Sequence, residues 1–147
     1  MLNDSNQITY IVHIRDLPIN LDMKTSIFTQ HQEYMEWLDK LVFYKEELKV
    51  MQKRLEEVVA KNTNSEMKFK AEHFQNLIFI EEQSIHKLSH HLLTEDKKIQ
   101  YNISQNPVAS DHRMAEDHVE DRNMIAFFEK NFNEIKKEFY LFVSAWM

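Results

Sequence analysis

The sequence predicts an all-α protein, an up-down-up bundle of three long antiparallel helices preceded by an extended N-terminal arm. Two observations predict this fold: apolar residues recur at helical spacing in three long stretches, and the 147 residues include no glycine. Average usage of ~7% would give about ten glycines. Because glycine supplies the positive-φ conformations of tight turns and many helix C-caps, we expect a few long elements joined by short polar links.

The first helix is predicted at about residues 25–62. Its apolar residues follow a heptad in two rows, which is a strong helix signal when it continues unbroken over so long a stretch. Helix formers such as Glu, Lys and Leu fill most other positions. The rows are Ile27, Tyr34, Leu41, Leu48 and Leu55, and Trp37, Tyr44, Met51 and Val58.

Two polar breaks predict where the second and third helices begin. In "KNTNSE", Thr63 and Glu66 match a capping box, in which side chains satisfy free N–H groups at a helix start. In "SQNPVAS", Ser110 is one of the residues able to cap the next helix. We therefore expect helices at about 65–102 and 110–147. Equal lengths and short links favour antiparallel neighbours.

The N-terminal arm, residues 1–24, has a different pattern. Its stretch "QITYIVHI", residues 7–14, alternates in the manner of a β-strand. A lone strand is unstable, so the arm is expected to pair with the same arm of a second chain or to lie along the bundle. Residues 25–147 are predicted to form a single helical-bundle domain.

The composition excludes several classes of protein. Without glycine the chain cannot form phosphate-cradling loops, and without cysteine it has no disulfide, thiol nucleophile or thiolate ligand. The net charge is −6 with both signs interspersed, so we expect no nucleic-acid partner. No apolar run approaches ~18 residues and no signal-peptide pattern begins the chain. We expect a cytoplasmic protein with no membrane partner.

Additional apolar residues widen the helix faces beyond a single stripe. They are Phe43, the run Ile78-Phe79-Ile80, Phe127 and the run Leu141-Phe142-Val143. Scattered apolar residues on a surface, or at the flanks of a core, are ordinary. A second buried face, however, would mean self-association, and the sequence favours a homo-oligomer such as a dimer, or binding to another helical protein.

Two polar residues interrupt the apolar stripe of the third helix. The stripe runs through Met114, His118, Asp121, Ile125, Phe128, Phe132, Ile135, Phe139, Phe142 and Trp146. In an antiparallel hairpin, residues equidistant from the turn lie at one level. Counting from the two predicted turns brings His31, His91 and Glu95 to the same end of the bundle as His118 and Asp121.

These five residues are a candidate metal site, because core-facing imidazoles and carboxylates are costly unless they are paired, hydrogen-bonded or bound to metal. Such a set suits Zn, Fe or Mn ions. Two alternatives remain. His118 and Asp121 pair with each other or with Tyr34 in a polar layer that fixes helix register, or the end of the bundle is solvated. Ferritin-like bundles use Glu-x-x-His, and none of the eight histidines has a glutamate three residues before it.

Three segments, "WLDKLVFYKEEL", "RLEEVVAKN" and "EHFQN", resemble an uncharacterised family of small helical proteins from bacteria of the Bacteroidetes type. The resemblance covers roughly residues 31–92. It implies a long helical hairpin and supplies no activity or functional residue.

The sequence favours a non-enzymatic structural or interaction protein, without cofactor, that self-associates or binds a helical partner. No arrangement of nucleophile, base and orienting group can be recognised, and helical bundles host many functions. The alternative is a bundle that binds a metal or small ligand through His31, His91, Glu95, His118 and Asp121.

Overall fold

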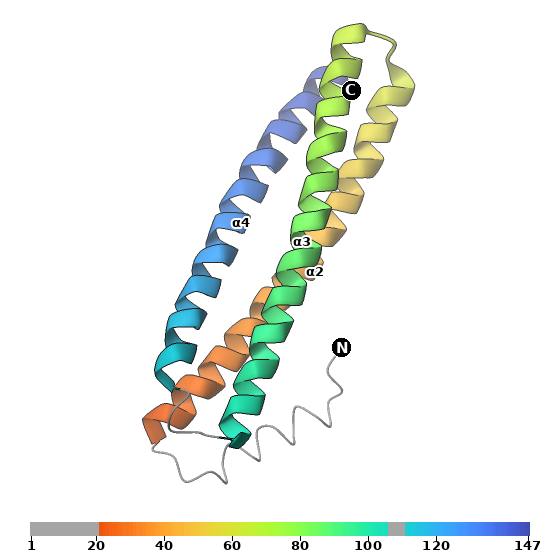
Figure 1. The fold of residues 1–147 in the computed structure, drawn as a ribbon. Coiled ribbons are helices and arrows are strands. Elements are labelled where there is room, and N and C mark those ends of the chain that lie inside the picture. Colours follow the sequence, from red (N-terminus) through yellow and green to blue (C-terminus); the bar gives the residue numbers. More distant parts are fainter. Residues whose placement is uncertain (1–20, 106–110) are drawn as a thin grey trace. The chain divides into compact units, whose positions relative to one another are not determined.

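The computed structural model describes residues 21–105 and 111–147, which form three α-helices (Figure 1). These are α2 (Leu21–Lys61), α3 (Ser65–Gln105) and α4 (Asp111–Trp146). The described part of the chain contains no strand. The prediction of an all-α fold with three long helices is therefore confirmed. Over the described residues, none of the helices has a stretch apolar enough to cross a membrane.

Two of the helices, α2 and α3, are longer than their apolar patterns indicate. Residues 21–24, predicted to belong to the extended arm, are the first turn of α2. Likewise α3 continues to Gln105 instead of ending near residue 102. The physical reason is that periodicity records only the turns packed against a core, while a helix continues until its backbone is interrupted. The strand-like stretch 7–14 lies outside the described residues.

The cap of α3 is Asn64, and not Thr63 as the capping-box pattern predicted. The Asn64 side-chain Oδ1 accepts hydrogen bonds from the backbone N–H groups of Glu66 at 2.8 Å and Met67 at 3.1 Å. An N-cap side chain satisfies the second and third amides of its helix. Since α3 begins at Ser65, only residue 64 has this spacing.

Replacing this cap has a predictable cost. We expect Asn64→Ala to lower the free energy of unfolding by about 1 kcal/mol, the usual effect of removing an N-cap acceptor. Thr63→Ala, at the neighbouring exposed position, is the matched control and should change stability by less than half as much. Urea unfolding followed by circular dichroism measures both. An equal loss in the two variants would contradict the assignment of the cap.

The described residues form two compact units, each with segments of all three helices. Unit 1 combines α2 up to Leu38 with residues 90–123, and unit 2 combines residues 39–89 with 124–147. The predicted single domain at 25–147 stays a prediction.

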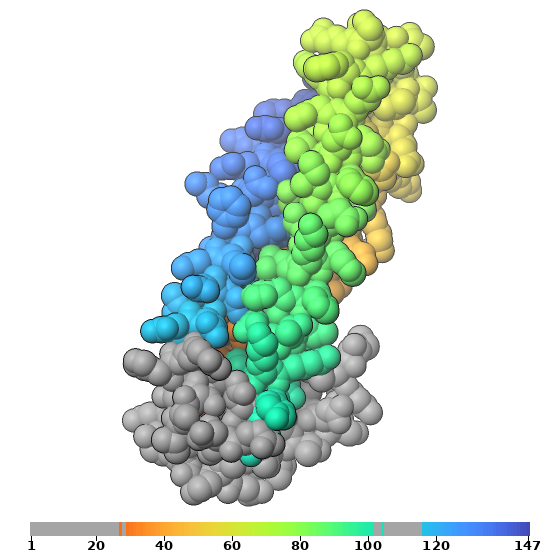
Figure 2. Space-filling view, in the orientation of Figure 1, coloured from red at the N-terminus to blue at the C-terminus, as the bar shows by residue number. Residues whose placement is uncertain are grey.

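Unit 2 has an apolar core rich in aromatic rings. Phe74 of α3 lies between two rings of α4, with centroid distances of 5.5 Å to Phe139 and 5.1 Å to Phe142. Figure 2 shows side chains of α3 and α4 adjoining on one face of this unit. At one end, the Asn62 side chain donates hydrogen bonds to the carbonyls of Val58 at 2.8 Å and Trp146 at 3.0 Å. These bonds satisfy backbone acceptors that the helix ends leave free.

The predicted heptad rows of α2 form its buried side. Both rows are buried except at Tyr44, which is half-buried and donates a hydrogen bond to Glu129 Oε1 at 3.1 Å. Burial and the neighbouring Glu129 carboxylate raise the pKa of Tyr44 to about 12. The heptad thus predicted which residues of α2 face the core.

One carboxylate is buried in unit 2. Glu81 is 3% exposed, and its Oε1 accepts a hydrogen bond from Asn131 Nδ2 at 3.1 Å, while its Oε2 has no hydrogen-bond partner. Burial raises the pKa of Glu81 above 4.5. The folded state therefore holds the Glu81 proton more tightly than the unfolded state. As a consequence, stability falls as the pH rises from 4.5 through the raised pKa.

We expect Glu81→Gln to raise the free energy of unfolding by about 1–2 kcal/mol near neutral pH, because the amide stays neutral and keeps its oxygen toward Asn131. Below the unfolded-state pKa the gain should vanish, since Glu81 is then protonated in both states. Urea unfolding at acidic and neutral pH, with exposed Glu82→Gln as the control, measures the difference. A gain that did not change with pH would contradict this account.

Candidate functional site

Unit 1 contains a group of interacting polar side chains, here called the polar cluster. It consists of His31, Glu33 and Tyr34 from α2, His91 and Asp96 from α3, and His118, Asp121 and Arg122 from α4. His31 and Tyr34 are three residues apart, as are His118 and Asp121, so each of these pairs lies on one face of its helix. Its buried members, His31, Tyr34, Asp96, His118 and Asp121, occupy positions that elsewhere in the three helices hold apolar core residues.

The first contact of the cluster joins α2 to α3. His31 Nδ1 lies 2.7 Å from Asp96 Oδ1, and both side chains are buried. The second oxygen, Asp96 Oδ2, accepts a hydrogen bond from Gln100 Nε2 at 3.2 Å. Both oxygens of this fully buried carboxylate therefore have a partner, as a buried charge requires.

Asp121 joins α4 to both other helices. Its Oδ2 accepts a hydrogen bond from the Tyr34 hydroxyl at 2.6 Å, and its Oδ1 lies 2.7 Å from His91 Nε2. Asp121 is buried, whereas the His91 side chain is 39% exposed. Burial, followed by the hydrogen bond to Asp121, raises the pKa of Tyr34, which keeps this hydroxyl protonated as a donor.

His118 is a buried polar side chain with aromatic neighbours. Its ring stacks on Trp37 at a centroid distance of 4.9 Å, and the Tyr34 ring meets it edge-on at 4.9 Å. Neither ring nitrogen has a hydrogen-bond partner. The nearest charged atom, Glu33 Oε1, lies 3.4 Å from Nε2. Burial lowers the pKa of His118, although the Glu33 carboxylate acts in the opposite direction.

At the edge of the cluster, Arg122 binds both carboxylate oxygens of Glu33 through two of its guanidinium nitrogens. Arg122 Nη2 donates to Glu33 Oε1 at 2.9 Å, and Nε donates to Oε2 at 3.2 Å. Although partial burial acts in the opposite direction, these hydrogen bonds lower the pKa of Glu33. Glu33 therefore faces two positively polarised neighbours, Arg122 and the His118 ring.

The structure brings four of the five predicted site residues into the cluster as separate pairs. His31 pairs with Asp96, His91 with Asp121, and His118 lies beside Glu33. The fifth residue, Glu95, is not in the cluster and pairs instead with Lys98 at 2.8 Å. Among the described side chains, no three His, Asp or Glu residues are grouped so that they could hold a metal ion.

Sequence reasoning missed Asp96, Glu33 and Arg122. For Asp96 a signal existed, because it lies four residues after Leu92 and three before Ile99, both on the predicted apolar face of the second helix. Glu33 and Arg122 lie at the edge of the cluster, where charged residues are ordinary. Their pairing gave no signal in the sequence.

The hydrogen bonds of the cluster connect the three helices of unit 1 to one another. His31 and Asp96 join α2 to α3, Tyr34 and Asp121 join α2 to α4, and His91 joins α3 to α4 through the same Asp121. Directional hydrogen bonds between buried groups fix one helix register, because sliding by one turn would leave the groups unpaired. The predicted pairing of Asp121 with Tyr34 is present, whereas His118 does not pair with Asp121.

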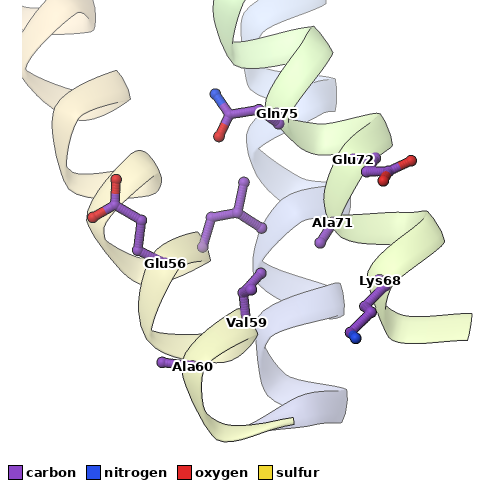
Figure 3. Close-up of a pocket in the computed structure, with 8 residues that line it drawn as sticks. Glu56, Val59, Ala60, Lys68, Ala71, Glu72 and Gln75 are labelled. Carbon is purple, nitrogen blue, oxygen red and sulfur yellow. The ribbon is translucent and has the colours of Figure 1, made fainter. Parts of the chain in front are cut away.

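Unit 2 contains an open groove of about 510 Å³ between α2 and α3, near the link between them (Figure 3). Apolar side chains line it together with the charged side chains of Glu56, Lys68 and Glu72. The lining residues are Leu55, Glu56, Val59, Ala60, Lys68, Ala71, Glu72 and Gln75. Two reciprocal hydrogen bonds of 2.9 Å between Gln52 and Gln75 tie its two helices together. The groove can accept an apolar group.

We compared the chain with models of protein families, with curated proteins and with solved structures, and nothing matched it.

Proposed function

We propose that the protein is a non-enzymatic, cytoplasmic helical-bundle protein that self-associates. The observation that carries this proposal is the set of large apolar side chains exposed on unit 2. Phe69 and Phe127 are each 75% exposed, and Phe43, Phe79, Ile80 and Leu141 are also exposed. Single exposed apolar residues are common, but many large ones on one compact unit are typical of proteins with protein–protein interaction sites.

The hydrogen bonds of the polar cluster support this proposal, because they join the three helices of unit 1. They hold these helices in one register, as a scaffold for helix-mediated interaction requires. The described side chains of the cluster include no serine, threonine or cysteine nucleophile beside a base. A structural role accounts for these hydrogen bonds without a reaction.

Sedimentation velocity over a range of protein concentrations tests the proposal. A chain of 17.8 kDa should sediment as a species of twice that mass, and it should dissociate reversibly on dilution. A mass of one chain at every concentration would overturn self-association. Such a result would leave the three-helix fold unaffected.

A second candidate function is binding of a metal ion, and the specific observation behind it is His118. Both of its ring nitrogens lack a hydrogen-bond partner, and the 3.4 Å between Nε2 and Glu33 Oε1 equals the spacing of two ligands around a tetrahedral ion with bonds of about 2.1 Å. The Arg122 guanidinium on Glu33 opposes a cation there, which is why this function ranks second.

Calorimetric titration with Zn²⁺ and Mn²⁺, using protein purified without a histidine tag, tests the metal candidate. Stoichiometric binding that is lost in His118→Phe but kept in the exposed-site control His90→Phe would support it. Absence of heat with both ions, together with unchanged melting after chelator treatment, would exclude it.

A further inference from the structure

Two rows of side chains, one on α3 and one on α4, share an outer face of unit 2, here called the α3–α4 face. Each row follows the three- and four-residue spacing of one helix side. The rows are Lys70, His73, Leu77, Ile80 and Ser84 on α3, and Met124, Phe127, Asn131, Glu134, Glu138, Leu141 and Ala145 on α4. Figure 2 shows side chains of these helices adjoining one another.

A hydrogen bond and a hollow show that the two rows flank the same face. Asn131 of α4 donates a hydrogen bond across to Glu81 of α3. At one end, a hollow of about 400 Å³ is lined by Lys70 and His73 from α3 and by Glu138 and Leu141 from α4. These four residues therefore lie at one level along the helices.

The α3–α4 face carries exposed apolar side chains in both of its rows. Ile80 is 53% exposed, Met124 47%, Phe127 75% and Leu141 64%. Half-buried Leu77 adds to the same surface. Covering these side chains would remove apolar surface from water, which is favourable in proportion to the area covered.

The other two sides of unit 2 are bridged by polar contacts. Between α2 and α4, Lys40 pairs with Glu129 at 3.1 Å, and Lys136 pairs with Glu47. Between α2 and α3, the amides of Gln52 and Gln75 bond to each other. The α3–α4 face also has a polar contact, from Asn131 to Glu81, but its rows carry the exposed apolar side chains Ile80, Phe127 and Leu141, which an apolar partner would cover.

This face carries charges of both signs, so that two copies of it can bring opposite charges together. At the level of the hollow, α3 carries Lys70, whereas α4 carries Glu138, with Glu134 one turn away. A two-fold axis parallel to the helices places α3 of one copy beside α4 of the other at the same level. Lys70 then meets Glu138 of the second copy, and the contact occurs twice.

We propose that the α3–α4 face of unit 2 binds the same face of a second copy about this two-fold axis, so that four helices pack together. This inference rests on the proposed self-association and names its surface and symmetry. Each α3 then lies antiparallel to α4 of the other copy, as neighbouring helices do in four-helix bundles. The second copy then covers Ile80, Phe127 and Leu141, and Lys70 and Glu138 lie with Leu141 at the end of the interface that contains the hollow.

The face is large enough for a stable dimer. Each helix contributes about 24 residues, or roughly 36 Å of length, and two helices side by side span about 20 Å. The product, about 700 Å² from each copy, approaches the ~800 Å² per partner of an ordinary stable interface.

Sedimentation velocity on apolar-to-charged variants tests the surface. We expect Phe127→Asp and Ile80→Asp each to raise the dimer dissociation constant about tenfold or more, since both place a charge in the interface. Phe43→Asp, at an α2 position whose 59% exposure lies between those of Ile80 and Phe127, is the matched control and should leave the dissociation constant unchanged. Circular dichroism checks that each variant keeps its helices and melting temperature.

The outcomes separate the two proposals. A wild-type monomer would overturn self-association and this inference together. A wild-type dimer unaffected by Phe127→Asp and Ile80→Asp, or one broken by Phe43→Asp, would overturn the α3–α4 face while self-association stands.

A charge exchange tests the symmetry. Glu138→Lys should weaken the dimer by placing two lysines opposite each other, and adding Lys70→Glu should restore it. If the double variant remains as weak as the single one, the axis parallel to the helices is wrong.

Discussion

Asp121→Ala is expected to lower the free energy of unfolding by about 3 kcal/mol or more, the cost of removing a buried charged acceptor. The substitution deletes the carboxylate that accepts a hydrogen bond from the Tyr34 hydroxyl at 2.6 Å and lies 2.7 Å from His91 Nε2. His91 is partly exposed and can turn to water. Tyr34 is 1% exposed, so its hydroxyl would stay buried without its acceptor.

Urea unfolding followed by circular dichroism measures this loss. Glu120→Ala, the exposed neighbour on the same helix, is the matched control and should change stability by about 0.5 kcal/mol at most. Asp121→Asn should fall between the two, because the amide keeps one oxygen as an acceptor while its NH₂ group replaces the other. If Asp121→Ala cost no more than Glu120→Ala, the polar cluster would not tie the helices together.

His118→Phe is expected to stabilise the protein by about 1–3 kcal/mol, the usual cost of a buried polar group without hydrogen bonds. Phenylalanine can keep the contacts with Trp37 and Tyr34, which hold the imidazole on two sides. Unlike the imidazole, its ring has no nitrogen that needs a partner. The loss of the Glu33 contact should be small, because Arg122 continues to bind that carboxylate.

The stabilisation should also depend on pH. Burial holds the pKa of His118 below 6.5, so below that pH the unfolded state takes up the proton more readily than the folded state. Wild-type stability is therefore lost as the pH falls from 6.5 through the lowered pKa, and His118→Phe lacks this loss. The advantage of the variant should grow on acidification.

Unfolding at neutral and mildly acidic pH, with the exposed His90→Phe as the control, tests the role of His118. The difference between the two variants isolates the buried ring, because all other titrating groups are common to both. A His118→Phe protein less stable than wild type would show that the imidazole makes an essential interaction. That result would favour the metal candidate and would justify repeating the titration at higher ion concentration.

The helices and most of the core could be predicted because both depend on local spacing. The rows from Ile27 to Leu55 and from Phe128 to Phe142 are regular enough that only one side of each helix can be buried. Helix ends were less predictable. Asn64 caps α3 because of its position relative to Ser65, and neighbouring Thr63 carries the same type of acceptor.

The candidate site was predictable in part. Counting residues from the helix links correctly placed His31, His91, His118 and Asp121 in one region of the fold. The same count could not predict which side chains pair with each other. Successive side chains of a helix are about 100° apart around its axis, so small rotations of a helix decide which atoms meet. Glu95 therefore pairs with Lys98 on its own helix, whereas Asp96, one residue further on, lies in the core.

The sequence by itself determined the three helices, their buried sides and the presence of polar groups among the apolar ones. Only the tertiary structure decided how those groups pair, left His118 without a hydrogen bond, and gathered exposed apolar residues of α3 and α4 on one face. The physical reason is that periodicity is a property of one helix, whereas a hydrogen bond or a shared surface depends on the rotation and level of two.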